Sequence, residues 1–170
     1  MQRCFWALCL VLPMLTGQIP QIGSMLLPMH IPVLLCGLVC GWQYGAAVGF
    51  VAPLLRSVLF GMPPMYPVAI AMAFELLTYG LVIGLVYRRM AQKGAAGVYA
   101  ALLTAMVAGR LVWGVAEVVL LGLGGKAFTA QTFLAGALLN AVPGIIVQLV
   151  LIPAVMAVLQ KAGAVKEYAE

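Results

Sequence analysis

Four ionisable residues lie within long apolar stretches of this sequence, where a charge needs a physical reason. They are two arginines and two glutamates, Arg56, Glu75, Arg110 and Glu117. An ionised side chain at the centre of a bilayer costs about 2.5–3.5 kcal/mol on insertion scales, so such residues pair with one another or mark a solute site. Because the two signs balance, this set predicts either internal ion pairs or a site for a polar ligand.

Aromatic and polar side chains accompany these charges. Arg110 and Glu117 are seven residues apart, which places them on one helix face, and Trp113 lies between them on nearly that face. An aromatic surface with a few fixed polar groups is typical of a small-molecule site. His30 fits a helix cap or a packing contact as well as a ligand contact. The residues expected to form the site are His30, Arg56, Glu75, Tyr79, Arg110, Trp113, Glu117 and Asn140.

These residues form no recognisable catalytic motif. The chain has one histidine and no aspartate, and it contains neither an HExxH motif nor a Gly-rich phosphate loop. Glu75 and Glu117 would have to act as acid and base with arginines nearby. Cys36 and Cys40 are one helical turn apart, but no histidine or carboxylate accompanies them. We therefore predict no enzyme activity, no cofactor and no metal site.

The composition indicates which solvent surrounds these residues. Hydrophobic residues make up 65% of the 170 residues and charged residues only 8%, whereas a soluble domain carries roughly 25% charged residues. Residues 4–55 contain no Asp, Glu, Lys or Arg, and this stretch exceeds the roughly 20 residues of one crossing. Continuous apolar runs favour helices over a barrel. We predict an all-α membrane protein in which residues 1–170 form a single transmembrane domain.

Prolines, glycines and the few charges divide the chain into six predicted transmembrane helices. These helices span residues 3–16, 29–41, 44–60, 68–88, 97–121 and 129–160. Residues 61–67 (GMPPMYP) cannot form a regular helix, because proline lacks the N–H and restricts the preceding residue. The last helix is expected to kink or tilt around Pro143 and Pro153.

The basic residues predict the orientation. With six helices both termini lie on one side, together with Arg3, the basic segment 88–93, Lys161 and Lys166, whereas only Lys126 lies opposite. The positive-inside rule makes the first side cytoplasmic, so the topology is N-in and C-in. Most of the polar set then lies in the outer half of the bilayer. The net charge of +5 is explained in this way, without a nucleic-acid partner.

Small residues recur every four positions along two predicted helices. They are Gly37, Gly41, Gly45 and Gly49, and then Gly80 and Gly84. Such ridges let helix backbones approach closely in lipid. Two interpretations stay open: packing within this chain, or docking against a partner membrane protein through Gly37, Gly41 and Gly45.

Several short motifs from His30 onward are recognisable. They are "HIPVLL", "YGA" and "VGF", the "GMPP" loop, and "AMAFEL" followed by "YG". Their resemblance is to the S components of energy-coupling factor (ECF) transporters, which are small six-helix membrane proteins that capture vitamins and related micronutrients. It extends more loosely through "GRLVWG" (109–114) and "AGALLNAVPGIIVQ" (135–148), and so covers most of the chain.

This resemblance implies a substrate site near the outer face, beneath the loops joining helices 1–2, 3–4 and 5–6. It also implies a membrane coupling (T) subunit, two cytoplasmic ATPases that supply the energy, and a location in the cell membrane of a prokaryote. In many members the first helix contacts the coupling subunit through small residues spaced by four. Aligned on Pro13, this chain offers Ala7, but Arg3 stands where the other small residue would fall.

Alternatives stay open for both the chemistry of the ligand and the functional class of the protein. Two buried arginines would suit a carboxylate such as niacin or pantothenate, and two glutamates would suit an amine or a ring N–H donor. The chain could instead be an assembly or structural protein that binds a partner through its glycine ridges. An intramembrane enzyme using Glu75 and Glu117, or an autonomous carrier or channel, is a further alternative.

Overall fold

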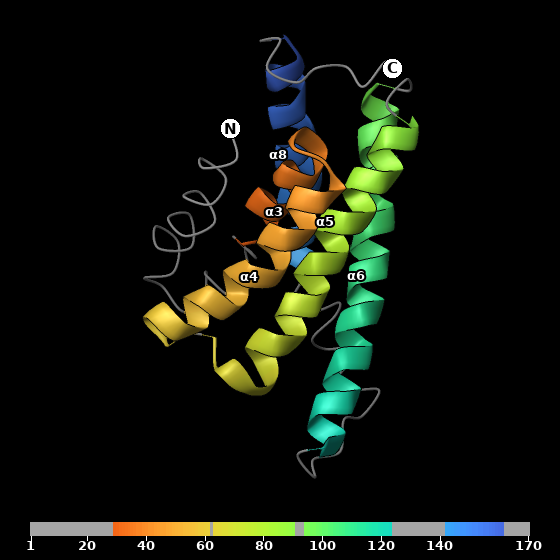
Figure 1. The fold of residues 1–170 in the computed structure, drawn as a ribbon. Helices are drawn as coiled ribbons and strands as arrows, with labels where there is room; N and C mark the ends of the chain where they lie inside the picture. Colours follow the sequence, from red (N-terminus) through yellow and green to blue (C-terminus); the bar gives the residue numbers. More distant parts are fainter. Residues whose placement is uncertain (1–28, 62, 91–93, 124–141, 162–170) are drawn as a thin grey trace.

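The computed structural model describes residues 29–61, 63–90, 94–123 and 142–161, and every regular element in these ranges is helical (Figure 1). The elements are α3 (His30–Val39), α4 (Trp42–Phe60), η1 (Met65–Ala69), α5 (Ile70–Met90), α6 (Ala95–Leu123) and α8 (Val142–Lys161). The predicted all-α class is thus confirmed for the described part of the chain. The predicted helix at 3–16 lies outside it.

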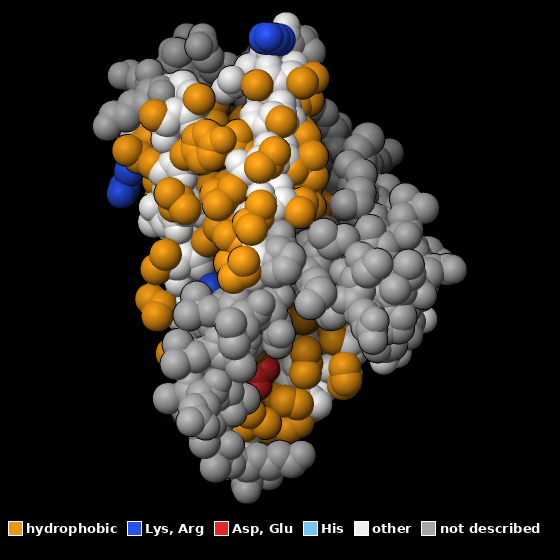
Figure 2. Space-filling view, turned by 180° about the vertical axis from the view of Figure 1, so that it is seen from behind, with side chains coloured by type: hydrophobic (Ala, Val, Ile, Leu, Met, Phe, Trp, Pro, Cys, Tyr) orange, Lys and Arg blue, Asp and Glu red, His pale blue; other side chains and the backbone are white. Residues whose placement is uncertain are grey.

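Three described stretches are long and apolar enough to cross a membrane. They are Met65–Met90, Ala95–Gly122 and Gly144–Lys161, while His30–Val39 is a shorter apolar helix. Large hydrophobic side chains are exposed along α6 and α8, and Figure 2 shows such side chains over much of one face. The exposed members on α6 include Leu103, Val107, Leu111, Val115 and Val118. A continuous apolar stripe of this length suits lipid rather than water.

The turn between α3 and α4 lies earlier in the chain than predicted. The predicted helices 29–41 and 44–60 leave residues 42–43 for the turn, whereas α4 already begins at Trp42. Cys40 and Gly41 join the two helices, and Gly41 has φ 96° and ψ 166°, a conformation that side chains disfavour. The N–H of Cys40 closes α3 by donating to the carbonyl of Cys36 at 2.8 Å.

The proline-rich segment before α5 departs from the α-helix, as predicted. Met65–Ala69 forms one π-helical turn, within which Tyr66 has the non-helical angles φ −117° and ψ 133°. Pro143 is the second residue of α8, where the missing N–H removes no helical hydrogen bond. Pro153 lies in the interior of α8.

Glycines set the distance between α3, α4 and α5. A Cβ added to Gly45 would lie 2.7 Å from the Cα of Gly37 and 2.9 Å from the carbonyl oxygen of Gly80. A Cβ on Gly84 would likewise lie 2.6 Å from the Cα of Trp42. Packing within the chain therefore accounts for Gly37 and Gly45, which are buried against their own bundle.

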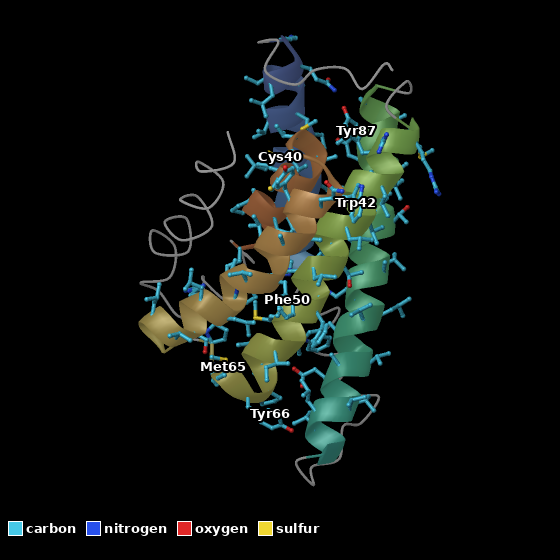
Figure 3. The ribbon with its side chains drawn as sticks, in the orientation of Figure 1. Cys40, Trp42, Phe50, Met65, Tyr66 and Tyr87 are labelled. Carbon is cyan, nitrogen blue, oxygen red and sulfur yellow. The ribbon has the colours of Figure 1, made fainter. Side chains whose placement is uncertain are left out.

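The bundle has two distinct ends. Figure 3 shows Met65 and Tyr66 at one end, which we name the proline-rich end, and Trp42, Cys40 and Tyr87 toward the other. We name the second the basic end, because Arg88 and Arg89 form the last turn of α5 there. At this end the side-chain amide of Gln160 on α8 donates to the Tyr87 hydroxyl at 3.1 Å. This contact places the C-terminal ends of α5 and α8 side by side.

Gly80→Ala is expected to destabilise the protein, because the added methyl would overlap the Gly45 backbone, which a helix cannot move cheaply. Overpacking of this kind costs about 1–3 kcal/mol. Thermal unfolding in detergent measures the effect. Gly122→Ala is the matched control, since a Cβ at Gly122 meets nothing within 4 Å. Equal melting temperatures for the two variants would contradict the packing argument.

Candidate functional site

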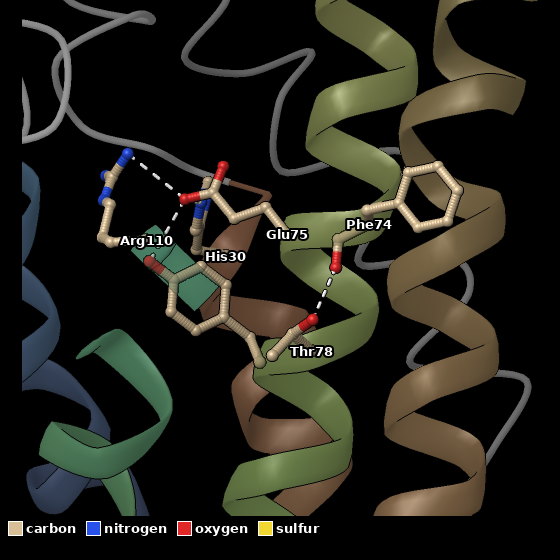
Figure 4. A network of polar contacts seen from close by, with 6 residues as sticks. His30, Phe74, Glu75, Thr78 and Arg110 are labelled. Atoms are coloured by element: carbon tan, nitrogen blue, oxygen red, sulfur yellow. Dashed lines mark hydrogen bonds and ion pairs between the residues drawn. The ribbon is translucent and has the colours of Figure 1, made fainter. Parts of the chain in front are cut away.

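Glu75 on α5 is the centre of a buried polar cluster. Its side chain is almost fully enclosed, with the residue 2% exposed. Its Oε1 atom lies 3.2 Å from Nη1 of Arg110, accepts a 3.2 Å hydrogen bond from the Tyr79 hydroxyl, and lies 3.6 Å from Nε2 of His30 (Figure 4). Helices α3, α5 and α6 thus meet at one carboxylate oxygen. We name Glu75, Arg110, Tyr79 and His30 the Glu75 cluster.

Local sequence features explain how these side chains converge. Tyr79 follows Glu75 by one helical turn, so the two share a face of α5. His30 is the first residue of α3, and its ring lies edge-on to the Tyr79 ring with centroids 5.2 Å apart. A Cβ on Gly109 would lie 2.9 Å from the Tyr79 ring. The glycine therefore lets the α6 backbone approach α5 closely and brings the neighbouring Arg110 to Glu75.

Several buried nitrogen atoms of the cluster form no hydrogen bond with another described residue. Buried nitrogens without a hydrogen-bond partner among the described residues are Nδ1 and Nε2 of His30, Nε and Nη2 of Arg110, and Nε2 of Gln148. A buried polar atom left unpaired costs about 1–3 kcal/mol. Native proteins rarely keep several such atoms together without a functional reason. Among the described residues, the cluster therefore keeps hydrogen-bonding capacity that the protein does not use.

Glu117 and Trp113 extend this polar face along α6. Glu117 is only 6% exposed and lies two turns beyond Arg110, and Trp113 between them is half-buried. The three residues lie on the inward side of α6, because Leu111 and Val115 occupy the exposed side of the same helix. Within the described ranges, no ion pair joins the Glu117 carboxylate to a basic side chain.

The remaining predicted residues are placed differently. Arg56 is half-buried near the proline-rich end of α4, and no ion pair among the described helices joins it to the Glu75 cluster. Asn140 and Ala7 lie outside the described residues. Two contributions were missed at the sequence level: buried Gln148 on α8, and Tyr66, whose hydroxyl donates to the backbone carbonyl of Leu120. An amide within an apolar helix could have revealed Gln148, whereas nothing local reveals the Tyr66 contact.

A cavity of about 180 Å³ lies at the basic end, away from the Glu75 cluster. Residues lining it include Cys40, Gly41, Trp42, Gln43, Tyr87 and Arg88. It contains no member of the charged cluster, so it is separate from the candidate site. No group of three or more His, Cys, Asp or Glu side chains suited to a metal occurs in the described part of the chain.

These features define a class: a helical membrane protein that buries a cluster of charged and polar side chains between apolar helices. A family model described as "ECF transporter, substrate-specific component" matches residues 4–156. The chain belongs to this family, whose members are substrate-capturing transport subunits rather than enzymes. Comparison with curated proteins and with solved structures gave no significant match.

Glu75→Gln is expected to lower thermal stability strongly, because it leaves the Arg110 guanidinium without its carboxylate partner. Removing one member of a buried pair costs about 3–5 kcal/mol. Tyr79→Phe is the milder control, since it removes a single hydrogen bond worth about 1 kcal/mol. The double variant Glu75→Gln, Arg110→Met should recover part of the lost melting temperature. A double variant no more stable than Glu75→Gln would argue against charge isolation as the cause.

Proposed function

We propose that this chain captures a vitamin or vitamin precursor at the outer face of a prokaryotic cell membrane and delivers it inward with energy from partner ATPases. The single observation that carries the proposal is the set of buried nitrogens on His30 and Arg110 that have no hydrogen-bond partner among the described residues. In a family of substrate-specific components, such donors are explained by a ligand that completes their hydrogen bonds. The surrounding apolar helices exclude water, which strengthens each polar contact to the ligand.

The proposed topology has six transmembrane helices in a single domain, with both termini in the cytoplasm. Arg88 and Arg89 end α5, and Lys161 ends α8 at the same end of the bundle. This agreement supports the basic end as the cytoplasmic end, since cytoplasmic loops carry an excess of Lys and Arg. The Glu75 cluster then lies toward the outside, beneath the proline-rich segment.

The proposed partners are a membrane coupling (T) subunit and two cytoplasmic ATPases, in keeping with the family. The sequence contains no Walker motif, so ATP hydrolysis would take place in the partners. Gly41, which is half-buried at the basic end, stays a candidate for docking, together with Ala7. Gly37 and Gly45 would be reached by a partner only if the helices separated.

The proposal is tested by purifying the protein in mild detergent, denaturing it and identifying the released small molecule by mass spectrometry. We expect a vitamin-like compound that raises the melting temperature of the folded protein when it is added back. Arg110→Ala should reduce its affinity at least tenfold, because charge-assisted hydrogen bonds contribute about 1.5–3 kcal/mol. Arg89→Ala is the matched control, since Arg89 is exposed at the basic end and should leave affinity unchanged.

Two outcomes would redirect the interpretation. Release of no compound, together with stable association with another membrane protein, would favour the assembly-protein alternative. A released compound bound equally well by the Arg110→Ala variant would keep the capture function but move the site away from α6.

A further inference from the structure

We infer that the captured ligand is amphoteric: a hydrogen-bond acceptor, such as a carboxylate, pairs with Arg110 and His30, and a donor, such as an amine, pairs with Glu117. This inference rests on the proposed function. It assigns opposite chemistry to the two ends of the ligand and fixes which end lies deeper in the bundle.

The deeper end is defined by an excess of donors. Oε1 of Glu75 already has Arg110, Tyr79 and His30 around it, so the carboxylate that could have attracted an amine is taken by the protein. Among the described residues, Nε and Nη2 of Arg110 and the two ring nitrogens of His30 have no hydrogen-bond partner. A guanidinium presents its donors as a planar fork that matches a carboxylate. An amine at this position would instead meet a positive charge.

The other end is defined by an acid without a counter-charge. Glu117 is 6% exposed, and no basic side chain among the described residues neutralises it. Beside a cationic group the Glu117 carboxyl is ionised, and an ionised carboxylate only accepts hydrogen bonds, so the group that pairs with it must donate. Arg110 does not fill this role, because its only ion pair among the described residues is with Glu75. An amine or ring N–H of the ligand supplies a donor, and a protonated amine also supplies the compensating charge.

The spacing of the two ends sets the length of the ligand. Arg110 and Glu117 are seven residues apart on α6, which corresponds to about 10 Å along the helix axis. Trp113 lies between them on the same face and is half-buried. Its ring offers a surface against which a flat ligand centre can stack.

Three matched probes test the inference: 4-(aminomethyl)benzoate carries both groups, 4-methylbenzoate lacks the amine, and 4-methylbenzylamine lacks the carboxylate. Binding to the full chain in detergent is measured by thermal shift and calorimetry. We expect the two-ended probe to bind at least about tenfold more tightly than either one-ended probe, since each end forms a charge-assisted pair.

Two variants test which residue binds the amine end of the ligand and which binds the carboxylate end. Glu117→Gln keeps the shape of the side chain and should remove the advantage of the amine-bearing probe over 4-methylbenzoate. Arg110→Lys keeps the positive charge beside Glu75 but loses the fork, so it should remove the advantage over 4-methylbenzylamine. If the two-ended probe still binds more tightly than both one-ended probes in both variants, the assignment is overturned.

The inference and the proposed function fail in different ways. If the compound released from the purified protein carries only one of the two groups, the amphoteric assignment is overturned while substrate capture stands. One-ended probes that bind as tightly as the two-ended probe would overturn the assignment in the same way. If no compound is released and no probe binds, both the assignment and the capture function are overturned.

Discussion

The buried carboxylate of Glu75 is the constraint on which the arrangement of the described helices depends. An ionised acid enclosed among apolar helices requires a compensating charge, and Arg110 supplies it from α6 at 3.2 Å. The Tyr79 hydroxyl and the His30 ring approach the same oxygen from α5 and α3. One atom thereby fixes the relative positions of three helices, and it does so beside nitrogens of Arg110 and His30 that have no hydrogen-bond partner in the described part of the chain.

Close backbone contact makes this convergence possible. Gly109 brings α6 against the Tyr79 ring, while Gly37, Gly45 and Gly80 bring α3, α4 and α5 together. Lipid offers no hydrophobic drive for helix association, so small residues and interhelical polar contacts must supply it. The glycine contacts and the Glu75 cluster are therefore complementary: the first set the helix separation, and the second sets the rotation of each helix about its axis.

Local chemistry explains which features the sequence predicted well. Prolines, glycines and charges bound α4, α5 and α6, and each predicted end falls within a few residues of the observed one. Balanced charges within apolar stretches indicated ion pairing as one alternative, and Glu75 and Arg110 form such a pair. Rotation of one helix against another is a tertiary property, so the sequence could not separate His30, which joins the cluster, from Arg56, which does not. Gln148 was overlooked because a lone amide gives a weak signal.

The length of α6 links this protein to the thickness of its bilayer. Its 29 residues correspond to about 43 Å at 1.5 Å per residue, whereas the hydrocarbon core is about 30 Å thick. A helix that is too long for its membrane tilts or extends beyond it. Because α6 carries Arg110, Trp113 and Glu117, a change in its tilt moves all three relative to Glu75. Hydrophobic mismatch therefore couples lipid composition to the geometry of the polar cluster.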